Sequence, residues 1–127
     1  MDDAQYASHC RALLTDFAQT LVTRTAHLPE ADPLRALALA FSQLGSEGND
    51  LYADGQNLVS RLFTAYPDFA PGFPRDLLWF FAGECLHYMP DEEITEYQQL
   101  DEMRREAAEQ GKTLDLRQAR ASLKSLQ

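Results

Sequence analysis

Hydrophobic residues recur along most of this chain at intervals of three and four positions, which is the spacing of one face of an α-helix. Over the first 27 residues this spacing predicts a helix from about Asp3 to His27 with one buried stripe, formed by Tyr6, Cys10, Leu13, Leu14, Phe17 and Leu21. A second helix is expected from Pro33 to Gly45, with Asp32 as its N-cap, because proline suits the first turn of a helix and glycine its end. The first third of the chain therefore predicts two amphipathic helices.

A third helix is expected to begin near Asn49 or Asp50 and to end at Pro67. Gly55 interrupts it at a cost of about 1 kcal/mol relative to alanine, and a glycine there would allow another helix to approach closely. Residues 66–74 contain three prolines, which forbid a continuous helix, and aromatic side chains that are costly to leave in water. We therefore expect an ordered connector over these residues.

Residues 75–89 are apolar in every direction around a helix axis, which is typical of a helix surrounded by protein. We predict one central helix here, against which the other helices pack or which forms the buried side of a dimer. A fifth helix is expected from Pro90 to Gly111. A short sixth helix follows, with Asp115 as N-cap and Gln118 three residues later.

The fold class follows from the scarcity of aliphatic β-branched residues. Only Val22, Val59 and Ile94 are of this kind, whereas Leu and Ala are abundant. Branched side chains suit a pleated strand, while Leu and Ala lose little on entering a helix. The sequence predicts an all-α fold: one domain over residues 1–127, a single compact bundle of about six helices around the central helix 75–89.

The formal net charge of −9 disfavours direct binding to nucleic acid or to an anionic membrane, because both need a basic surface. No apolar run approaches the roughly 18 residues that span a bilayer. The acidic N-terminus does not match the basic region of a signal peptide, so a cytoplasmic location is expected. Cys10 and Cys85 lie far apart and form no CxxC pair, which excludes a zinc ribbon or a disulfide framework.

The charge is unevenly distributed. Residues 76–103 contain eight acids and no Lys or Arg, whereas residues 104–127 contain six bases and three acids. A dense patch of one sign steers partners of the opposite sign, so one part of the surface is expected to attract a basic partner protein. An acidic mimic of nucleic acid, which would occupy a basic groove, is an alternative interpretation.

Glu84 and His87 are the one pair of residues whose spacing is a candidate for catalysis or metal binding. They lie three positions apart, so both side chains share one helix face, and Glu-x-x-His is the spacing of di-iron sites in helical bundles. Such a site needs a second motif of this kind and further carboxylates, which the sequence lacks, so no metal or cofactor is predicted. Glu84 and His87 remain candidate ligand contacts: a buried Glu84 would have a raised pKa. The structural alternative is that Glu84 bonds a helix terminus or a tyrosine and His87 caps the end of its helix.

A second candidate is an interaction surface. It would combine the aromatic residues of the connector with the acidic first turns of the fifth helix (Tyr66, Phe69, Phe73, Asp91, Glu92, Glu93 and Glu96). Aromatic side chains are enriched at protein interfaces. The alternative is that Phe69 and Phe73 fill the core while the acids are a solvated helix end.

These observations favour a helical module that acts by protein–protein interaction, as a regulator or adaptor, through another protein or through self-association. The sequence contains no nucleophile elbow, phosphate-binding glycine loop or dinucleotide fingerprint, which argues against an enzyme. The alternative is an enzyme or sensor that binds a small molecule or metal in a pocket beside Glu84 and His87.

Overall fold

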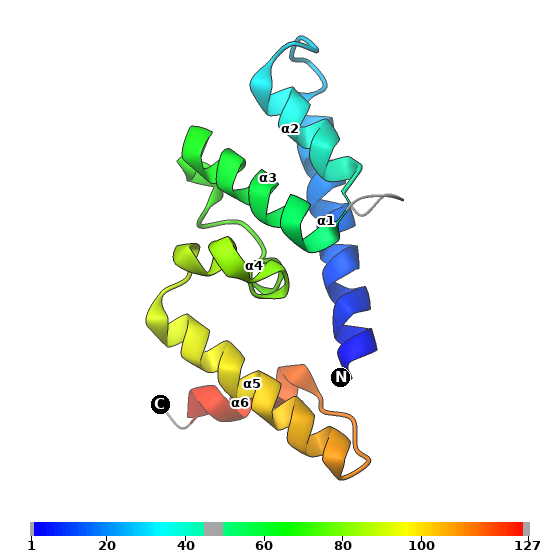
Figure 1. Ribbon diagram of the computed structural model, residues 1–127, viewed down its shortest axis with the longest axis vertical. Coiled ribbons are helices and arrows are strands. Elements are labelled where there is room, and N and C mark those ends of the chain that lie inside the picture. Colours follow the sequence, from blue (N-terminus) through cyan, green and yellow to red (C-terminus); the bar gives the residue numbers. More distant parts are fainter. Residues whose placement is uncertain (1, 45–49, 126–127) are drawn as a thin grey trace. The chain divides into compact units, whose positions relative to one another are not determined.

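The computed structural model describes residues 2–44 and 50–125 of the chain (Figure 1). They form six α-helices and two short 3₁₀-helices, in the order α1 (Asp3–Thr25), α2 (Pro33–Ser42), α3 (Leu51–Ala65), η1 (Pro67–Phe69), α4 (Arg75–Phe81), η2 (Gly83–Tyr88), α5 (Asp91–Glu109) and α6 (Leu116–Ser125). No strand occurs among these residues, so the predicted all-α fold is confirmed. Gly45 and Asn49, expected at two helix ends, lie outside the described residues.

Three of the helices that follow α1 begin at aspartates whose carboxylates accept backbone hydrogen bonds. The Asp32 carboxylate accepts from the amide of Leu34 at 2.9 Å, as expected of an N-cap. Asp50 caps α3 in the same way, and Asp115 accepts from the amide of Gln118 at 3.1 Å ahead of α6. Each carboxylate satisfies amides that have no partner inside the helix. These three starts are therefore fixed by local sequence, as the pattern predicts.

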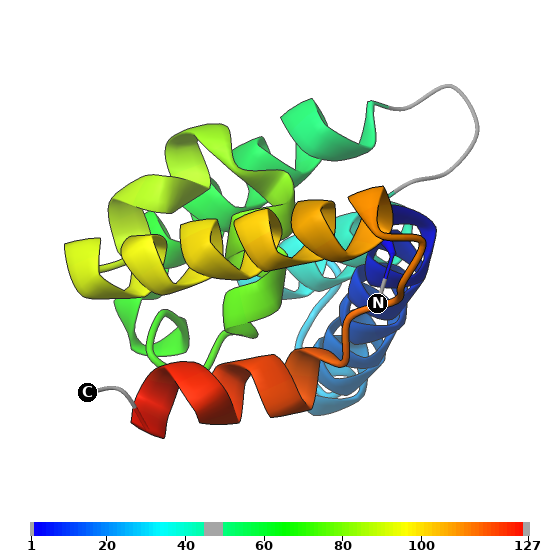
Figure 2. The same cartoon turned by 90° about the horizontal axis from the view of Figure 1, so that it is seen from below.

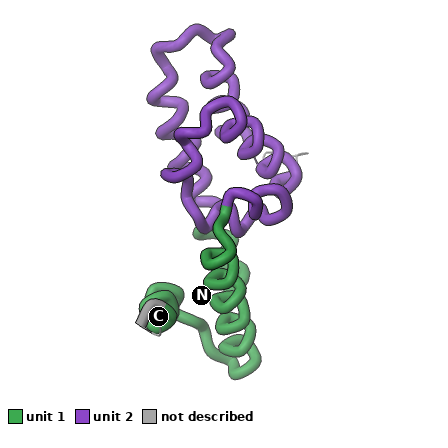
Figure 3. Tube along the Cα trace, turned by 90° about the vertical axis from the view of Figure 1, so that its left-hand side faces the viewer, with its two compact units in different colours: residues 1–9, 89–127 green, residues 10–88 purple. Residues whose placement is uncertain are grey.

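By its internal contacts the chain divides into two compact units (Figure 3). Unit 1 consists of Met1–His9 and Met89–Gln127, and unit 2 of Cys10–Tyr88. The helix α1 contributes its first two turns to unit 1 and the rest to unit 2.

The core of unit 2 is aromatic at its centre. Phe73 is 1% exposed and lies edge-on to Phe17, with ring centroids 4.8 Å apart, and to Phe63, at 5.3 Å. Such edge-to-face pairs stabilise a core beyond the area they bury. Phe41, Leu62, Leu77, Leu78 and Phe81 complete the largest fully buried side chains, together with Val59, Cys10 and Cys85.

The continuous helix predicted over residues 75–89 is wrong. The α-helix ends at Phe81, Ala82 has φ 57° and ψ −151°, and Gly83 has φ 53°. The chain then continues as the 3₁₀-helix η2. Two consecutive positive φ angles cannot be accommodated in an α-helix, and the Gln56 side chain donates a 2.8 Å hydrogen bond to the carbonyl oxygen of Phe81 that α4 leaves free.

This segment is also less enclosed than its composition predicts. Leu77, Leu78, Phe81 and Cys85 are buried, but Trp79 and Phe80 are partly exposed. The break lets buried residues of α4 and η2 face the core of unit 2 and turns the remaining side chains outward.

In unit 1, α5 and α6 lie side by side as an antiparallel pair (Figure 2). Gly111, with φ 70°, ends α5 as predicted. The amide of Lys112 bonds the carbonyl of Ala107 at 2.7 Å and that of Gly111 bonds Ala108 at 3.0 Å, which is a Schellman motif. Tyr97 and Leu100 of α5 and Ala119 of α6 are buried.

Candidate functional site

An open groove of about 450 Å³ runs along α1 in unit 2. Its second wall is the segment from η1 to Pro74. We call it the α1 groove; it is lined by Leu13, Asp16, Phe17, Thr20, Leu21, Arg24, Asp68, Phe69, Gly72 and Pro74.

The α1 wall consists of two rows of side chains at four-residue spacing. One row is apolar (Leu13, Phe17, Leu21) and the other is polar (Asp16, Thr20, Arg24). Residues four apart lie on the same helix face, so each row runs parallel to the groove. Leu21 is buried, whereas Leu13 and Phe17 are half-buried because one side of each faces the groove. The groove thus has an apolar floor and a polar edge.

The groove is held open by the packing beneath it. The Phe17 ring packs edge-on against Phe73 and Phe41, so its position is fixed from below. On the other wall, the guanidinium of Arg75 donates to the carbonyl of Ala70 at 3.2 Å and to that of Tyr88 at 3.1 Å. These bonds fix the connector that carries Phe69. A preformed surface loses little conformational entropy on binding.

The charged residues of the groove are available to a partner. Asp16, Arg24 and Asp68 are exposed, and within the described part of the chain their side chains have no hydrogen bond or ion pair. Asp16 and Arg24 are eight residues apart on one helix, which places them about 12 Å apart along its axis. An apolar floor edged by unpaired charges of both signs is suited to binding an amphipathic surface.

Glu84 and His87, the sequence-predicted ligand contacts, lie on η2. The His87 Nε2 is 3.5 Å from a Glu84 carboxylate oxygen, and the two side chains are 76% and 74% exposed. The structure therefore brings them together, but in solvent rather than in a buried pocket. Among the described residues, no three His, Cys, Asp or Glu side chains are grouped to hold a metal ion.

Cys85, between these two residues, is buried. Burial, and secondarily the nearby Glu84 carboxylate, raises the pKa of the Cys85 thiol to about 12. The thiol therefore stays protonated at neutral pH, whereas the reactive form of cysteine is the thiolate.

The predicted interaction surface is divided by the fold. Phe73 is buried between Phe17 and Phe63 and offers no contact surface, which corrects the prediction for this residue. Phe69 is half-buried and lines the α1 groove. Tyr66 is also half-buried, but it lines a separate cavity of about 390 Å³ beside α2 and α3.

The acidic residues of the predicted surface belong to unit 1, whereas the aromatic ones belong to unit 2. They occupy the first turns of α5: Asp91 and Glu92 are exposed, and Glu93 and Glu96 are partly exposed. Their position at the start of the helix is the one that the helix dipole favours for acids.

Sequence reasoning missed the α1 wall of the groove. The spacing of Leu13 and Phe17 predicts that both belong to the buried stripe of the first helix. The available signal was the width of the stripe: Cys10, Leu14 and Ala18 form one buried row, so Leu13 and Phe17 beside it lie at the edge of the buried face and are only half-buried.

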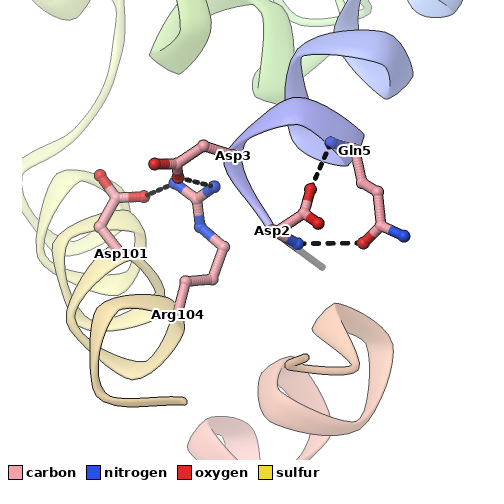
Figure 4. Close-up of polar contacts among 5 residues, drawn as sticks. All are labelled: Asp2, Asp3, Gln5, Asp101 and Arg104. Carbon is pink, nitrogen blue, oxygen red and sulfur yellow. Dashed lines mark hydrogen bonds and ion pairs between the residues drawn. The ribbon is translucent and has the colours of Figure 1, made fainter. Parts of the chain in front are cut away.

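Unit 1 contains a cluster of polar contacts around Arg104 (Figure 4). Its guanidinium lies 3.1 Å from the Asp3 carboxylate, 2.6 Å from that of Asp101, and 4.5 Å from the ring centroid of Tyr6. Nearby, the Asp2 amide bonds the Gln5 side chain at 3.0 Å and the Gln5 amide bonds the Asp2 carboxylate at 2.7 Å, a capping box for α1. Because the Arg104 donors are already engaged, we regard this cluster as structural.

A model of the PA2817-like family matches residues 3–127. The chain belongs to the PA2817-like family. The match covers both units, and with them the whole α1 groove of this PA2817-like protein. Neither the curated proteins nor the solved structures include a significant match. Among its described residues, no helix combines the length and the apolar character needed to cross a bilayer.

Proposed function

We propose that this PA2817-like protein is a non-enzymatic module that acts by binding another protein through the α1 groove. The observation that supports this is the combination of an apolar floor (Leu13, Phe17, Phe69) with charged edge residues that lack partners in the described chain. Apolar anchors surrounded by polar residues are the usual composition of an interface.

The dimensions of the groove favour a protein partner over a small molecule. The α1 wall extends from Leu13 to Arg24, about 16 Å along the helix, which is three helical turns. Small-molecule sites usually enclose most of the ligand surface, but here Asp16, Thr20, Arg24, Asp68 and Gly72 are all exposed. An open groove of this length suits an amphipathic helix, which binds through side chains on successive turns.

The enzyme alternative has less support. A catalytic acid or base acquires a shifted pKa by desolvation or by a nearby charge. Glu84 and His87 are both about three-quarters exposed, and the Cys85 thiol between them is held in its protonated form. We also propose a cytoplasmic location, in keeping with Cys10 and Cys85, which are both buried and not joined in a disulfide.

The test is capture of partners from the native host with the tagged protein and two matched variants. Phe69→Ala removes an anchor of the groove, and Leu39→Ala removes a side chain that is 42% exposed on α2, outside the groove. We expect the partner set of the wild type to be lost with Phe69→Ala and kept with Leu39→Ala. Equal partner sets for all three proteins, with unchanged circular dichroism, would contradict the proposal.

A second binding surface is favoured by the exposed and partly exposed acids at the start of α5. Asp91, Glu92 and Glu93 lie in one helical turn of a chain with a net charge of −9, an arrangement that attracts a basic partner. Changing all three to lysine should abolish any salt-sensitive capture of basic proteins. Capture that survives this change would exclude the acidic surface, including its interpretation as a nucleic-acid mimic.

A further inference from the structure

We propose that the partner of the α1 groove is a second copy of this chain, bound by antiparallel pairing of the two α1 helices. This inference rests on the proposed role of the groove as a binding surface. The charges along the α1 wall of the groove, Asp16 and Arg24, form an arrangement that is complementary to itself.

A two-fold interface brings the same surface of two molecules together, so each group must find its complement on that same surface. Thr20 lies midway between Asp16 and Arg24, four residues from each, or about 6 Å along the helix axis. If the two-fold axis passes at Thr20, antiparallel α1 helices place Asp16 of each copy beside Arg24 of the other. Two equivalent ion pairs then form at once.

The same charges exclude the other orientation. Parallel pairing, which needs a two-fold axis running along the helices, would set Asp16 against Asp16 and Arg24 against Arg24, and like charges in contact disfavour association. Within the described residues neither side chain has an intramolecular partner that would have to be displaced. The two charges therefore select both the antiparallel direction and the register.

The apolar part of the interface has the same symmetry. Leu13, Phe17 and Phe69 are half-buried in the isolated chain, so a second α1 seated in the groove would complete their burial. Thr20, on the axis, is small and exposed, and a small side chain allows two helices to pack closely. A contact of only three helical turns is shorter than those of obligate dimers, so the dimer should form in a concentration-dependent way.

Two charge-reversal variants test this geometry. Their masses, and that of the wild type, are measured by sedimentation velocity of the full chain over a range of protein concentrations. Asp16→Arg places two positive charges on the α1 wall of the groove, and Arg24→Asp places two negative charges there, while Asp68 on the opposite wall is unchanged in both. Each single variant should be monomeric where the wild type is dimeric. An equimolar mixture of the two should form a dimer again, and so should the double variant with both changes.

The control is Arg11→Asp, which reverses an exposed charge of α1 outside the groove and should leave the dimer unchanged. Circular dichroism on every variant distinguishes loss of the dimer from loss of the fold. The proposal is overturned by a wild type that stays monomeric at all concentrations, by single variants that still form dimers, or by failure of the mixture to restore association.

Failure of this inference can be distinguished from failure of the proposed function. A monomeric wild type whose groove variants nevertheless lose a different captured protein would leave the groove as a binding surface with another partner. If the groove variants change neither the mass in solution nor the captured proteins, both the dimer and the proposed binding role of the groove are contradicted.

Discussion

The ring of Phe81 lies directly over Gly55. A Cβ atom at residue 55 would come within 2.4 Å of a ring carbon of Phe81, closer than real contacts allow. Phe81 is 1% exposed, so its ring is surrounded by other side chains and cannot shift without moving them. The close approach of α3 and α4 thus depends on the glycine, which explains why a residue with poor helix propensity occupies the middle of α3.

Gly55→Ala should lower the free energy of unfolding even though alanine is the better helix former. The propensity gain is about 1 kcal/mol, whereas overpacking a rigid core costs about 1–3 kcal/mol. We expect a net loss of up to about 2 kcal/mol in urea denaturation. Gly72→Ala is the matched control, because nothing lies within 4 Å of its Cβ position; it should be neutral or slightly stabilising. A stabilised Gly55→Ala would contradict the packing described here.

Ala82→Gly should stabilise the protein. With φ 57° and ψ −151°, Ala82 occupies a region that is essentially restricted to glycine and costs of order 1–3 kcal/mol for other residues. After subtracting the greater entropy of glycine in the unfolded chain, we expect a gain of about 1 kcal/mol. Ala70→Gly is the contrasting control, since Ala70 has φ −61° and should lose stability by about 0.5–1 kcal/mol. Equal effects at the two positions would show that the backbone at Ala82 is not strained.

The contacts of Arg104 should contribute unequally to the stability of unit 1. Its ion pair with Asp3 involves a carboxylate that is 98% exposed, so Asp3→Asn should cost less than about 0.5 kcal/mol. Arg104→Ala also removes the contact with the Tyr6 ring and the 2.6 Å ion pair with Asp101, and should cost about 1–2 kcal/mol. Faster hydrogen exchange at the amides of residues 3–9 would show the loss of stability at the start of α1. Equal protection in Asp3→Asn and Arg104→Ala would contradict this order.

The buried thiol of Cys85 should make stability fall at high pH. Its pKa is raised from an ordinary 9.0 to about 12 in the folded protein, so the unfolded chain loses the proton first as the pH rises. The stabilising contribution is therefore complete below pH 9 and is lost between pH 9 and 12. At pH 8 neither buried cysteine should react with a thiol reagent until the protein is unfolded. Rapid labelling of the native protein at Cys85 would exclude this burial.

Local features were predictable from the sequence, and contacts between distant segments were not. The caps at Asp32, Asp50 and Asp115, and the glycine stop at Gly111, act within a few residues and leave a direct signal. The break after Phe81 depends on Gln56, 25 residues earlier in the chain. The side-chain amide of Gln56 donates a hydrogen bond to the Phe81 carbonyl oxygen, which has no partner inside the helix. A pattern of apolar residues cannot show such a long-range bond.

The candidate site was only partly predictable for the same reason. The aromatic connector was correctly singled out, and its Phe69 lines the α1 groove, but Phe73 from the same segment fills the core. Composition cannot distinguish an aromatic residue on the edge of a groove from one beneath it. The opposite wall, with Asp16 and Arg24, forms a groove only because the fold brings η1, which is distant in sequence, to face α1.

Photo-crosslinking at residue 69 tests most directly whether the α1 groove is the binding surface. A photoreactive phenylalanine analogue in place of Phe69 lines the groove with little change of shape, and the same group at Arg11 lies on α1 outside the groove. On irradiation in the native host, we predict a crosslinked product from position 69 with the mass of two copies of this chain, and none from position 11. No product at position 69, or the same products from both positions, would contradict the account.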